Sequence, residues 1–297
     1  MSEARVAAER CAALGASSQQ FEQYAARQVK LGELPVLRAL PVRNRRLIGP
    51  WCFLDRFGPL TFAAGNPMDV APHPHIGLQT VSWLLDGEVV HDDSLLQQAL
   101  LRPGGVNVMT SGAAIAHSER TPDDNTGRLN GVQLWAALPD AHRGGAPAFQ
   151  HLPEVPAFEE RGGIARVFSG TLGSARSPAR HYSDLVGADL EVHAAGSLAV
   201  PLNPEHEHGV MLLGGDATLE GQALDPATLY YLGTRRSEVT MASGRGARVL
   251  LVGGRPFGET ILMWWNFVRR FGDVPGYPGA RLAAPELAKL ARPNPVS

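Results

Sequence analysis

The sequence predicts an all-β protein built from two antiparallel β-domains. Glycine (33 residues) and proline (23 residues) are abundant among the 297 residues, which favours many turns and short strands over long helices. Most of the chain reads as short apolar segments separated by turn residues, which is typical of a sandwich or barrel. A chain of this length is long for one compact domain and natural for two.

A weak internal echo supports two similar halves. Residues 84–88 read Leu-Leu-Asp-Gly-Glu, and residues 212–216 read Leu-Leu-Gly-Gly-Asp. In both places an apolar strand runs into a tight turn and an acidic residue. We interpret this as a duplicated β-domain, with a first domain over residues 34–147 and a second over residues 148–297.

Helices are predicted only outside the main β-segments. Apolar residues in 1–33 recur at roughly helical spacing, so we expect an N-terminal helical extension that either packs on the body or a partner, or is partly ordered. Short helices are expected at 177–185 and 285–290. The aromatic-rich stretch 256–270 is expected to begin a helix whose aromatic residues are mostly buried against a barrel, and stacking on a ligand is the alternative role for them.

Two pairs of ligand-type residues mark the candidate site. The first pair is His73 and His75, and the second is His117 and Glu119. Side chains two apart on a strand point to the same face, so each pair aims together. The forty or so intervening residues suffice for two or three strands that bring the pairs back into contact. Three imidazoles and one carboxylate inside a barrel would bind a first-row transition metal.

The number of ligands bears on the chemistry. Four protein ligands leave two neighbouring positions of an octahedron open, as in non-haem iron enzymes that activate dioxygen or bind a substrate through two atoms. A closed structural zinc site is the competing interpretation, although such sites usually use cysteine. The chain has only Cys11 and Cys52, which we expect to be free thiols of a cytoplasmic protein.

Other histidines are weaker candidates. His206 and His208 form a second His-x-His pair, but no histidine follows them, so we expect a surface or loop-lining role and no second metal. His91, which is followed by Asp92 and Asp93, could assist proton transfer near the site, although polar residues after a hairpin are usually exposed.

Composition excludes several classes of function. The net charge is −2, and the densest basic run, residues 43–46, is expected to be a solvated loop, so we predict no nucleic-acid binding. No apolar run approaches the roughly 20 residues of a membrane span, and the charged N-terminus has no signal-peptide core. Nucleophile-elbow, phosphate-loop and dinucleotide-binding motifs are not found in the sequence.

Several motifs together resemble the pirin family of the cupin superfamily. They are His73-Pro-His-Ile-Gly-Leu-Gln-Thr-Val81, Leu84-Leu-Asp-Gly-Glu88, His91-Asp-Asp-Ser94, Arg102-Pro-Gly-Gly-Val106, Met109-Thr-Ser-Gly112, Ile115-Ala-His-Ser-Glu119 and, upstream, Phe53-Leu-Asp-Arg-Phe-Gly-Pro59. The match is specific over about residues 50–140 and looser over 195–270. The resemblance implies a bicupin, two antiparallel jelly-roll barrels with metal in the N-terminal one only.

The resemblance also implies the cofactor and its ligands. In the family the metal, usually iron, is held by residues that match His73, His75, His117 and Glu119; Zn, Mn, Ni, Co and Cu are the alternatives to Fe(II). Gln79 stands where the family commonly has a glutamate. We expect this difference to lie near the site, to leave metal binding intact and to change either the redox tuning or the proton handling of the site.

Two functions follow from the resemblance. Some bacterial pirins resemble quercetin 2,3-dioxygenases, which implies a small aromatic or flavonol-like substrate, with Glu119 as a ligand and as the catalytic base that takes the substrate's hydroxyl proton. Other pirins act by protein contact, which implies a non-catalytic, iron-dependent redox sensor or regulator that binds a protein partner.

Overall fold

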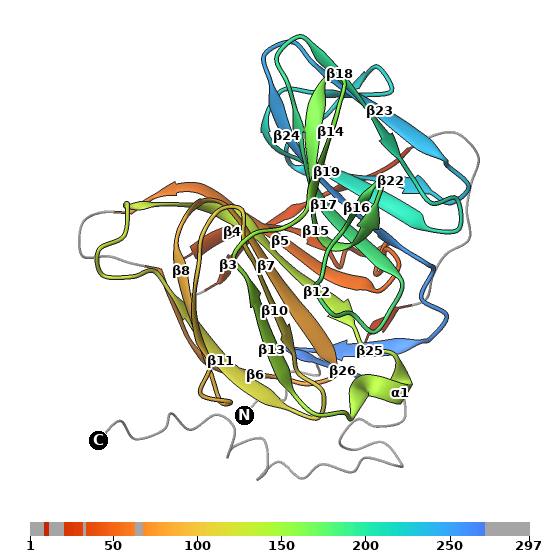
Figure 1. The fold of residues 1–297 in the computed structure, drawn as a ribbon. Coiled ribbons are helices and arrows are strands. Elements are labelled where there is room, and N and C mark those ends of the chain that lie inside the picture. Colours follow the sequence, from red (N-terminus) through yellow and green to blue (C-terminus); the bar gives the residue numbers. More distant parts are fainter. Residues whose placement is uncertain (1–8, 12–20, 32–33, 63–67, 271–297) are drawn as a thin grey trace.

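The computed structural model describes residues 9–11, 21–31, 34–62 and 68–270, which form two β-barrels side by side (Figure 1). Two antiparallel β-barrels were predicted from the sequence and the resemblance, and each consists of one large and one small sheet. In the first barrel the large sheet has the order β13-β10-β7-β12-β5-β4-β3, and the small sheet has the order β6-β11-β8-β9. These strands are β3 (Arg27–Leu31), β4 (Leu34–Leu40), β5 (Trp51–Thr61), β6 (Asp69–His75), β7 (Leu78–Gly87), β8 (Val89–Asp93), β9 (Gln98–Leu101), β10 (Val106–Thr110), β11 (Ile115–Arg120), β12 (Arg128–Ala137) and β13 (Ala148–Leu152).

The second barrel repeats this plan. Its large sheet has the order β14-β15-β17-β24-β19-β22-β2, with β16 paired to β15, and its small sheet has the order β18-β23-β20-β21. The strands are β2 (Glu22–Ala25), β14 (Ala157–Glu160), β15 (Gly163–Leu172), β16 (Ala175–Arg176), β17 (Leu185–Val192), β18 (Gly196–Pro201), β19 (Glu207–Gly215), β20 (Thr218–Leu219), β21 (Gln222–Ala223), β22 (Thr228–Gly233), β23 (Glu238–Ser243) and β24 (Ala247–Gly254).

Two glycines show that the halves correspond. Gly87 ends the pairing of β7 with β12, and Gly215 ends the pairing of β19 with β24. Both have positive φ, +86° and +73°, and at either position a Cβ atom would lie 2.2 Å from a carbonyl oxygen of the neighbouring chain segment. Only glycine fits such a turn, so the echo in the sequence reflects equivalent strand ends.

The helix predictions were wrong wherever the structure describes the residues. Residues 177–184 form no helix, and the stretch 261–270 forms a hairpin of β25 (Ile261–Trp264) and β26 (Phe267–Arg270), to which β1 (Glu9–Cys11) adds a third strand. Within the described ranges α1 (Asp140–Arg143) is the only α-helix, and none is long and apolar enough to cross a membrane. The predicted helix at 285–290 lies outside the described residues.

The described residues of the N-terminal segment, 9–11 and 21–31, form strands, contrary to the predicted helical extension. β2 pairs with β22 of the second barrel, whereas β3 pairs with β4 of the first. The buried Arg45 of the first barrel holds this segment: its Nη2 donates to Glu22 Oε2 at 3.0 Å, and its guanidinium lies 3.6 Å from the ring centroid of Tyr231. Part of the basic run is therefore not a solvated loop, because the arginine links β2 to the interface between barrels.

β13 bears on the predicted boundary at residue 147. Although it follows that boundary, β13 pairs with β10 of the first barrel over all five of its residues. The division into residues 34–147 and 148–297 stays a prediction, and the strand pairing favours a junction a few residues later.

The large sheets of the two barrels pack face to face. One cluster of buried apolar side chains draws on both barrels, with Trp51, Leu54 and Trp83 from the first and Phe168 and Leu250 among those from the second. Trp83 stacks on Phe168, with ring centroids 5.2 Å apart. Because this packing uses one face of β5 and β7, the opposite face of these strands is left to the interior of the first barrel.

Polar groups of the first barrel satisfy backbone carbonyls of the second across this interface. Trp51 Nε1 lies 3.0 Å from the carbonyl oxygens of both Val186 and Gly253. Arg56 donates to the carbonyls of Leu212 and Leu213 at 3.1 and 2.9 Å. Buried acceptors of this kind are costly to leave unpaired, so these donors fix how the barrels dock.

The two barrel interiors are filled differently. The second contains 24 buried apolar residues in one cluster, including Leu190, Val210 and Val249. The first has a smaller apolar cluster of eight buried residues beside a cavity. A metal and a ligand therefore have room in the first barrel.

We expect Trp51→Phe to lower the free energy of unfolding by about 2–4 kcal/mol, because it removes a buried N–H that serves two carbonyls and leaves a small void. Urea denaturation followed by circular dichroism measures this. Leu96→Ala, at an 81% exposed residue, is the control and should change stability by less than about 0.5 kcal/mol. A Trp51→Phe protein as stable as the wild type would show that the hydrogen bonds from Trp51 Nε1 to Val186 and Gly253 do not stabilise the docked barrels.

Candidate metal centre

The four predicted ligands lie on neighbouring strands, as expected from their spacing. His73 and His75 are on β6, and His117 and Glu119 are on β11. The strands pair antiparallel with His117 opposite His73, and the register shifts between His117 and Glu119. The extra residue lies on β6, between Val70 and His73, whereas β11 pairs with β8 in regular register from His117 to Arg120. His117 and Glu119 therefore keep the two-residue alternation that points them to one face of β11.

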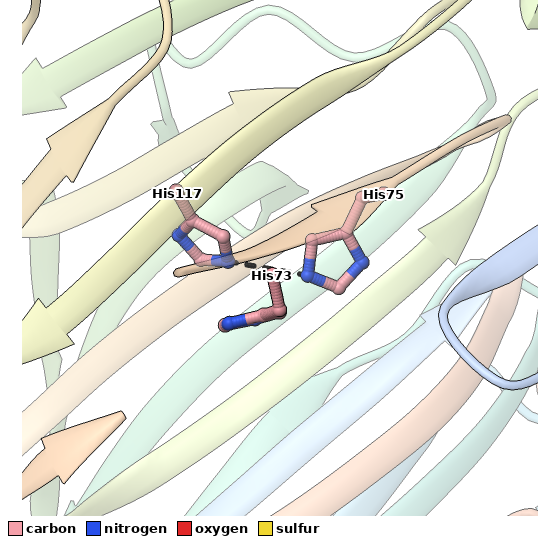
Figure 2. Close-up of side chains that lie close together, drawn as sticks. All are labelled: His73, His75 and His117. Carbon is pink, nitrogen blue, oxygen red and sulfur yellow. Dashed lines mark hydrogen bonds between the residues drawn. The ribbon is translucent and has the colours of Figure 1, made fainter. Parts of the chain in front are cut away.

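Three histidines converge in the first barrel (Figure 2). His75 Nε2 and His117 Nε2 are 3.1 Å apart, and the His73 ring centroid lies 5.0 Å from that of His75 and 4.5 Å from that of His117. Ligand atoms of all three lie within 4.8 Å of one another. Nitrogens bound to one metal at about 2.0–2.1 Å and at right angles would be about 2.9 Å apart, so the observed spacing suits a shared metal.

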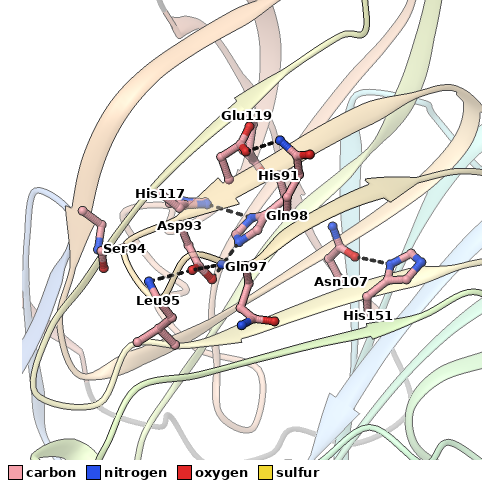
Figure 3. A network of polar contacts seen from close by, with 12 residues as sticks. His91, Asp93, Ser94, Leu95, Gln97, Gln98, Asn107, His117, Glu119 and His151 are labelled. Carbon is pink, nitrogen blue, oxygen red and sulfur yellow. Dashed lines mark hydrogen bonds and ion pairs between the residues drawn. The ribbon is translucent and has the colours of Figure 1, made fainter. Parts of the chain in front are cut away.

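Hydrogen bonds select the ring tautomers that a metal needs. His73 Nδ1 lies 2.9 Å from the carbonyl oxygen of Ala71, which can only accept, so Nδ1 carries the proton and Nε2 has the free lone pair. His117 Nδ1 lies 3.3 Å from His91 Nδ1, and His91 Nε2 lies 3.2 Å from Asp93 Oδ2 (Figure 3). With Asp93 accepting from His91, His91 accepts from His117, and His117 Nε2 is free to bind a metal.

His91 is thus part of the site and not an exposed residue after a hairpin. It is 2% exposed and stacks on Phe149 of β13, with centroids 4.2 Å apart and planes 4° from parallel. Asp93 Oδ1 in turn accepts from the backbone N–H groups of Leu95 and Gln97. The chain Asp93–His91–His117 is therefore held at both ends.

Glu119 is the predicted ligand that does not join the three-histidine group. Among the described residues its carboxylate lies within 4.8 Å of ligand atoms of His91 and His117 instead. Glu119 Oε1 is 3.3 Å from the hydroxyl of Ser82, which is also 2.7 Å from Gln133 Oε1. Glu119 is half-buried, which leaves its side chain room to change rotamer. Such a change would bring the carboxylate to a metal held by the histidines.

Burial keeps two of the imidazoles neutral. Loss of hydration, and then the nearby His73, hold the pKa of His75 well below its ordinary value. Burial, followed by His75, His73 and His91, does the same for the pKa of His117. Metal ligands must be deprotonated, so this environment favours metal binding over protonation.

The histidines open onto a cavity of about 620 Å³. One wall is a stack of rings: the guanidinium of Arg38 lies 4.5 Å from the Phe53 centroid, Phe53 stacks on Trp135 at 3.9 Å, and Trp135 meets His75 edge-on at 5.1 Å. Arg38 also binds both carboxylate oxygens of Asp55, at 2.8 and 2.7 Å, and burial raises the pKa of Asp55 in spite of this pairing. Sequence reasoning missed these residues, although Phe53, Asp55 and Phe57 alternate on β5 and so share its inner face.

Gln79 lies elsewhere, contrary to the expectation that it sits near the site. On β7 it shares a face with Val81 and Trp83, which pack between the barrels, whereas Ser82 lines the cavity. Gln79 Nε2 donates to Thr110 Oγ1 at 2.8 Å and to the carbonyl of Arg180 at 3.0 Å. The glutamine therefore joins the first barrel to the segment before β17 and does not touch the three histidines.

The second His-x-His pair is buried and does not line a surface loop, as the sequence had suggested. His206 and His208 are 4% and 1% exposed, and His206 Nε2 lies 3.0 Å from Asp184 Oδ2. Both groups of three potential metal ligands found among the described residues belong to the first barrel. A single metal site, in the first half only, stays a prediction.

Comparison with known proteins identifies the family. The pirin family model matches residues 33–136, and the model of the pirin C-terminal cupin domain matches residues 187–271. A Caulobacter vibrioides "Pirin-like protein" is 36% identical over 255 residues, covering 84% of this chain and 88% of its own. This chain belongs to the pirin family.

Pirins similar to this one carry names that refer to a reaction. A Pseudomonas aeruginosa relative named "Putative quercetin 2,3-dioxygenase PA1205" is 42% identical over 275 residues, covering 86% of this chain and 87% of its own. A crystal structure titled quercetin 2,3-dioxygenase from Acinetobacter baumannii superposes with a TM-score of 0.82 at 42% identity, covering 90% of this chain and 95% of that one. The Escherichia coli pirin YhhW, solved with nickel(II), shares the fold at a TM-score of 0.63 and 17% identity, over 80% of this chain and 100% of that one.

We expect His91→Phe to weaken metal binding by about 10- to 100-fold, because the ring would still stack on Phe149 but could no longer accept from His117. Competition with a chromophoric chelator measures the affinity for Ni(II) and Zn(II). His151→Phe is the control, since His151 bonds to Asn107, away from the three histidines. An affinity unchanged in His91→Phe would show that this hydrogen bond does not support the site.

The free energy of unfolding should decrease as the pH is lowered, because His208 is buried in its neutral form. Burial, and then the charge of His206, lower the pKa of His208 to about 3 in the folded protein, against about 6.5 in the unfolded chain. Between these values the unfolded chain binds a proton that the folded protein excludes, so acidification costs about 1.4 kcal/mol of stability per pH unit from this group. We expect His208→Gln to reduce the pH slope of the unfolding free energy by about that amount between pH 6 and 4, whereas Leu96→Ala should leave the slope as in wild type. Equal slopes in all three proteins would contradict this.

Proposed function

We propose that the first barrel binds one divalent transition metal through His73, His75, His117 and Glu119, with Fe(II) as the physiological ion. The support is the convergence of three imidazoles, of which His73 and His117 have hydrogen bonds that leave Nε2 free, and of which His75 and His117 are kept neutral by burial. Zn, Mn, Ni, Co and Cu suit the same donors, and imidazole with carboxylate does not by itself choose among them. His91 would orient His117 from outside the ligand set.

We further propose that the protein is a dioxygenase that cleaves quercetin-like flavonols. The observation that carries this is the cavity of about 620 Å³, walled by stacked aromatic rings, that opens directly onto the three histidines. Pockets that bind small molecules in proteins commonly have volumes of about 300–1,000 Å³, are mostly apolar and carry a few placed polar groups. The names of the Pseudomonas and Acinetobacter relatives give the substrate class.

Residues of the chain would transfer the proton and bind the substrate. A bound metal supplies Lewis-acid chemistry and a place for dioxygen. Glu119, which lines the cavity and contacts Ser82, would accept the flavonol hydroxyl proton as general base. Phe53 and Trp135 would hold the planar rings, and the ion pair of Arg38 with Asp55 would face the distal hydroxyl groups.

A second candidate is an iron-dependent redox sensor that binds a protein partner. The observation in its favour is that Trp264 and Trp265 are 40% and 62% exposed, although the sequence had suggested that this stretch is mostly buried. Pull-downs from the native cell under reducing and oxidising conditions test it, with Trp264→Ala as comparison. A partner retained in one redox state supports the sensor, and no retained partner in either state removes it.

We expect Fe(II)-loaded protein to consume dioxygen in the presence of quercetin and His117→Ala to reduce uptake to background, because it removes a ligand at the centre of the cluster. An oxygen electrode measures uptake, and elemental analysis measures bound metal. His151→Phe, which lies outside the cluster, should retain the wild-type rate. Metal-loaded wild-type protein without quercetin-dependent uptake would remove quercetin as the substrate.

Glu119→Gln separates the two roles of the carboxylate in the same assay. If Glu119 is the general base, Glu119→Gln should lower the rate of dioxygen uptake by about 10²- to 10⁴-fold while the three histidines still hold the metal. Loss of metal together with activity would instead assign Glu119 to binding alone.

A further inference from the structure

The hairpin of β25 and β26 follows the second barrel in sequence but closes on the first (Figure 1). Phe267 forms a parallel bridge with Ile76, and the N–H of Val268 donates to the Ile76 carbonyl at 2.8 Å. Ile76 directly follows His75. Gly77 allows this contact, because a Cβ atom there would lie 2.1 Å from the Val268 carbonyl oxygen. The hairpin is thus fixed against the strand that carries two candidate ligands.

Trp265 occupies a strained position at the tip of this hairpin. Trp264 pairs with Phe267, so the turn consists of Trp265 and Asn266 alone. Trp265 has φ = +50°, a conformation that glycine, asparagine or aspartate usually occupies in such turns and that costs a bulky residue free energy. Strained residues of this kind are concentrated at functional sites, where the side chain that the strained backbone presents has a role.

Packing does not provide that purpose. Trp265 is 62% exposed, and among the ring contacts of the described residues it has one, edge-on to Phe267 at 5.3 Å. A tryptophan that stabilised the fold would be buried. An exposed and strained tryptophan is therefore better explained by something that it contacts outside the folded chain.

The cavity above the histidines indicates what that contact is. Trp265 lines this cavity together with His73 and His75, whereas its neighbour Trp264 is not part of the lining. Trp135 lines the same cavity and meets His75 edge-on. A planar ligand held near the histidines would therefore meet an indole contributed by the hairpin as well as the rings of the barrel.

We propose that Trp265 is a specificity-determining residue that stacks on the planar aromatic part of the ligand at the mouth of the metal cavity. The proposal rests on the proposed function for the class of ligand, a flavonol-like molecule. It adds that recognition depends on a residue from the end of the second family domain, and not only on the barrel that holds the metal. Aromatic stacking favours planar rings over aliphatic chains of similar size.

The test compares Trp265→Gly with Trp265→Phe and Trp264→Ala. Glycine relieves the positive φ, so Trp265→Gly should melt at the wild-type temperature or above it. Isothermal titration calorimetry without oxygen, on Ni(II)-loaded protein, measures binding of quercetin, flavone and decanoate. Flavone has the planar rings without hydroxyl groups, and decanoate is an aliphatic comparator.

We expect Trp265→Gly to weaken quercetin and flavone by about 3- to 10-fold and to leave decanoate unchanged. Trp265→Phe should stay within about twofold of wild type, and Trp264→Ala should match it. A destabilised Trp265→Gly protein, equal losses for decanoate, or wild-type affinity for both flavonoids would each overturn the proposal. So would a wild-type protein that binds neither quercetin nor flavone.

The outcomes separate this inference from the proposed function. Binding of flavonoids that depends on Trp265, without dioxygen uptake, would leave the inference standing and remove the dioxygenase. Quercetin-dependent uptake with unchanged KM and Kd in Trp265→Gly would support the dioxygenase and overturn the inference. If Trp265→Gly instead abolishes retention of a protein partner and leaves flavonoid binding intact, the tryptophan belongs to a protein interface.

Discussion

The packing of one large sheet against the other is the constraint on which the rest of this pirin depends. β5 and β7 are buried on both faces, so each side chain on them is committed either to the interface or to the first barrel's interior. Trp51, Trp83 and Arg56 serve the interface, where they meet carbonyls and a carboxylate of the second barrel. Phe53 and Asp55, which flank the interface residue Leu54, and Ser82, which precedes Trp83, line the cavity instead.

The two barrels have different interiors. The second is filled by apolar packing around buried histidines, and neither group of three potential metal ligands found among the described residues lies in it. The first contains a cavity, and polar and aromatic side chains are among the residues that line it. The second barrel nevertheless contributes to the site indirectly, since it anchors the sheet that carries the cavity wall and leads into the hairpin that ends at Trp265.

The fold and the centre of the site could be predicted because they depend on local parity. The His-x-His pair on β6 and the turn glycines Gly87 and Gly215 follow from two-residue alternation and from positive φ. The predictions for Gln79 and for residues 261–270 were wrong because they depend on contacts that the alternation of side chains along one strand does not determine. Gln79 faces away from the site because the strand also has an interface side. Residues 261–270, where the aromatic-rich sequence suggested a helix, form a hairpin, because β1 and Ile76 offer backbone partners that lie far away in sequence.

The path of the chain around residue 26 ties the two barrels together in a further way. Ala26 is the single residue between β2, which completes the second barrel's large sheet, and β3, which completes that of the first. A fragment that begins after the first barrel would lack residues 22–25 and would expose β22 as an unpaired edge, open to strands of other molecules. In this chain the large sheet of the C-terminal cupin domain is thus completed by a strand that lies more than a hundred residues upstream.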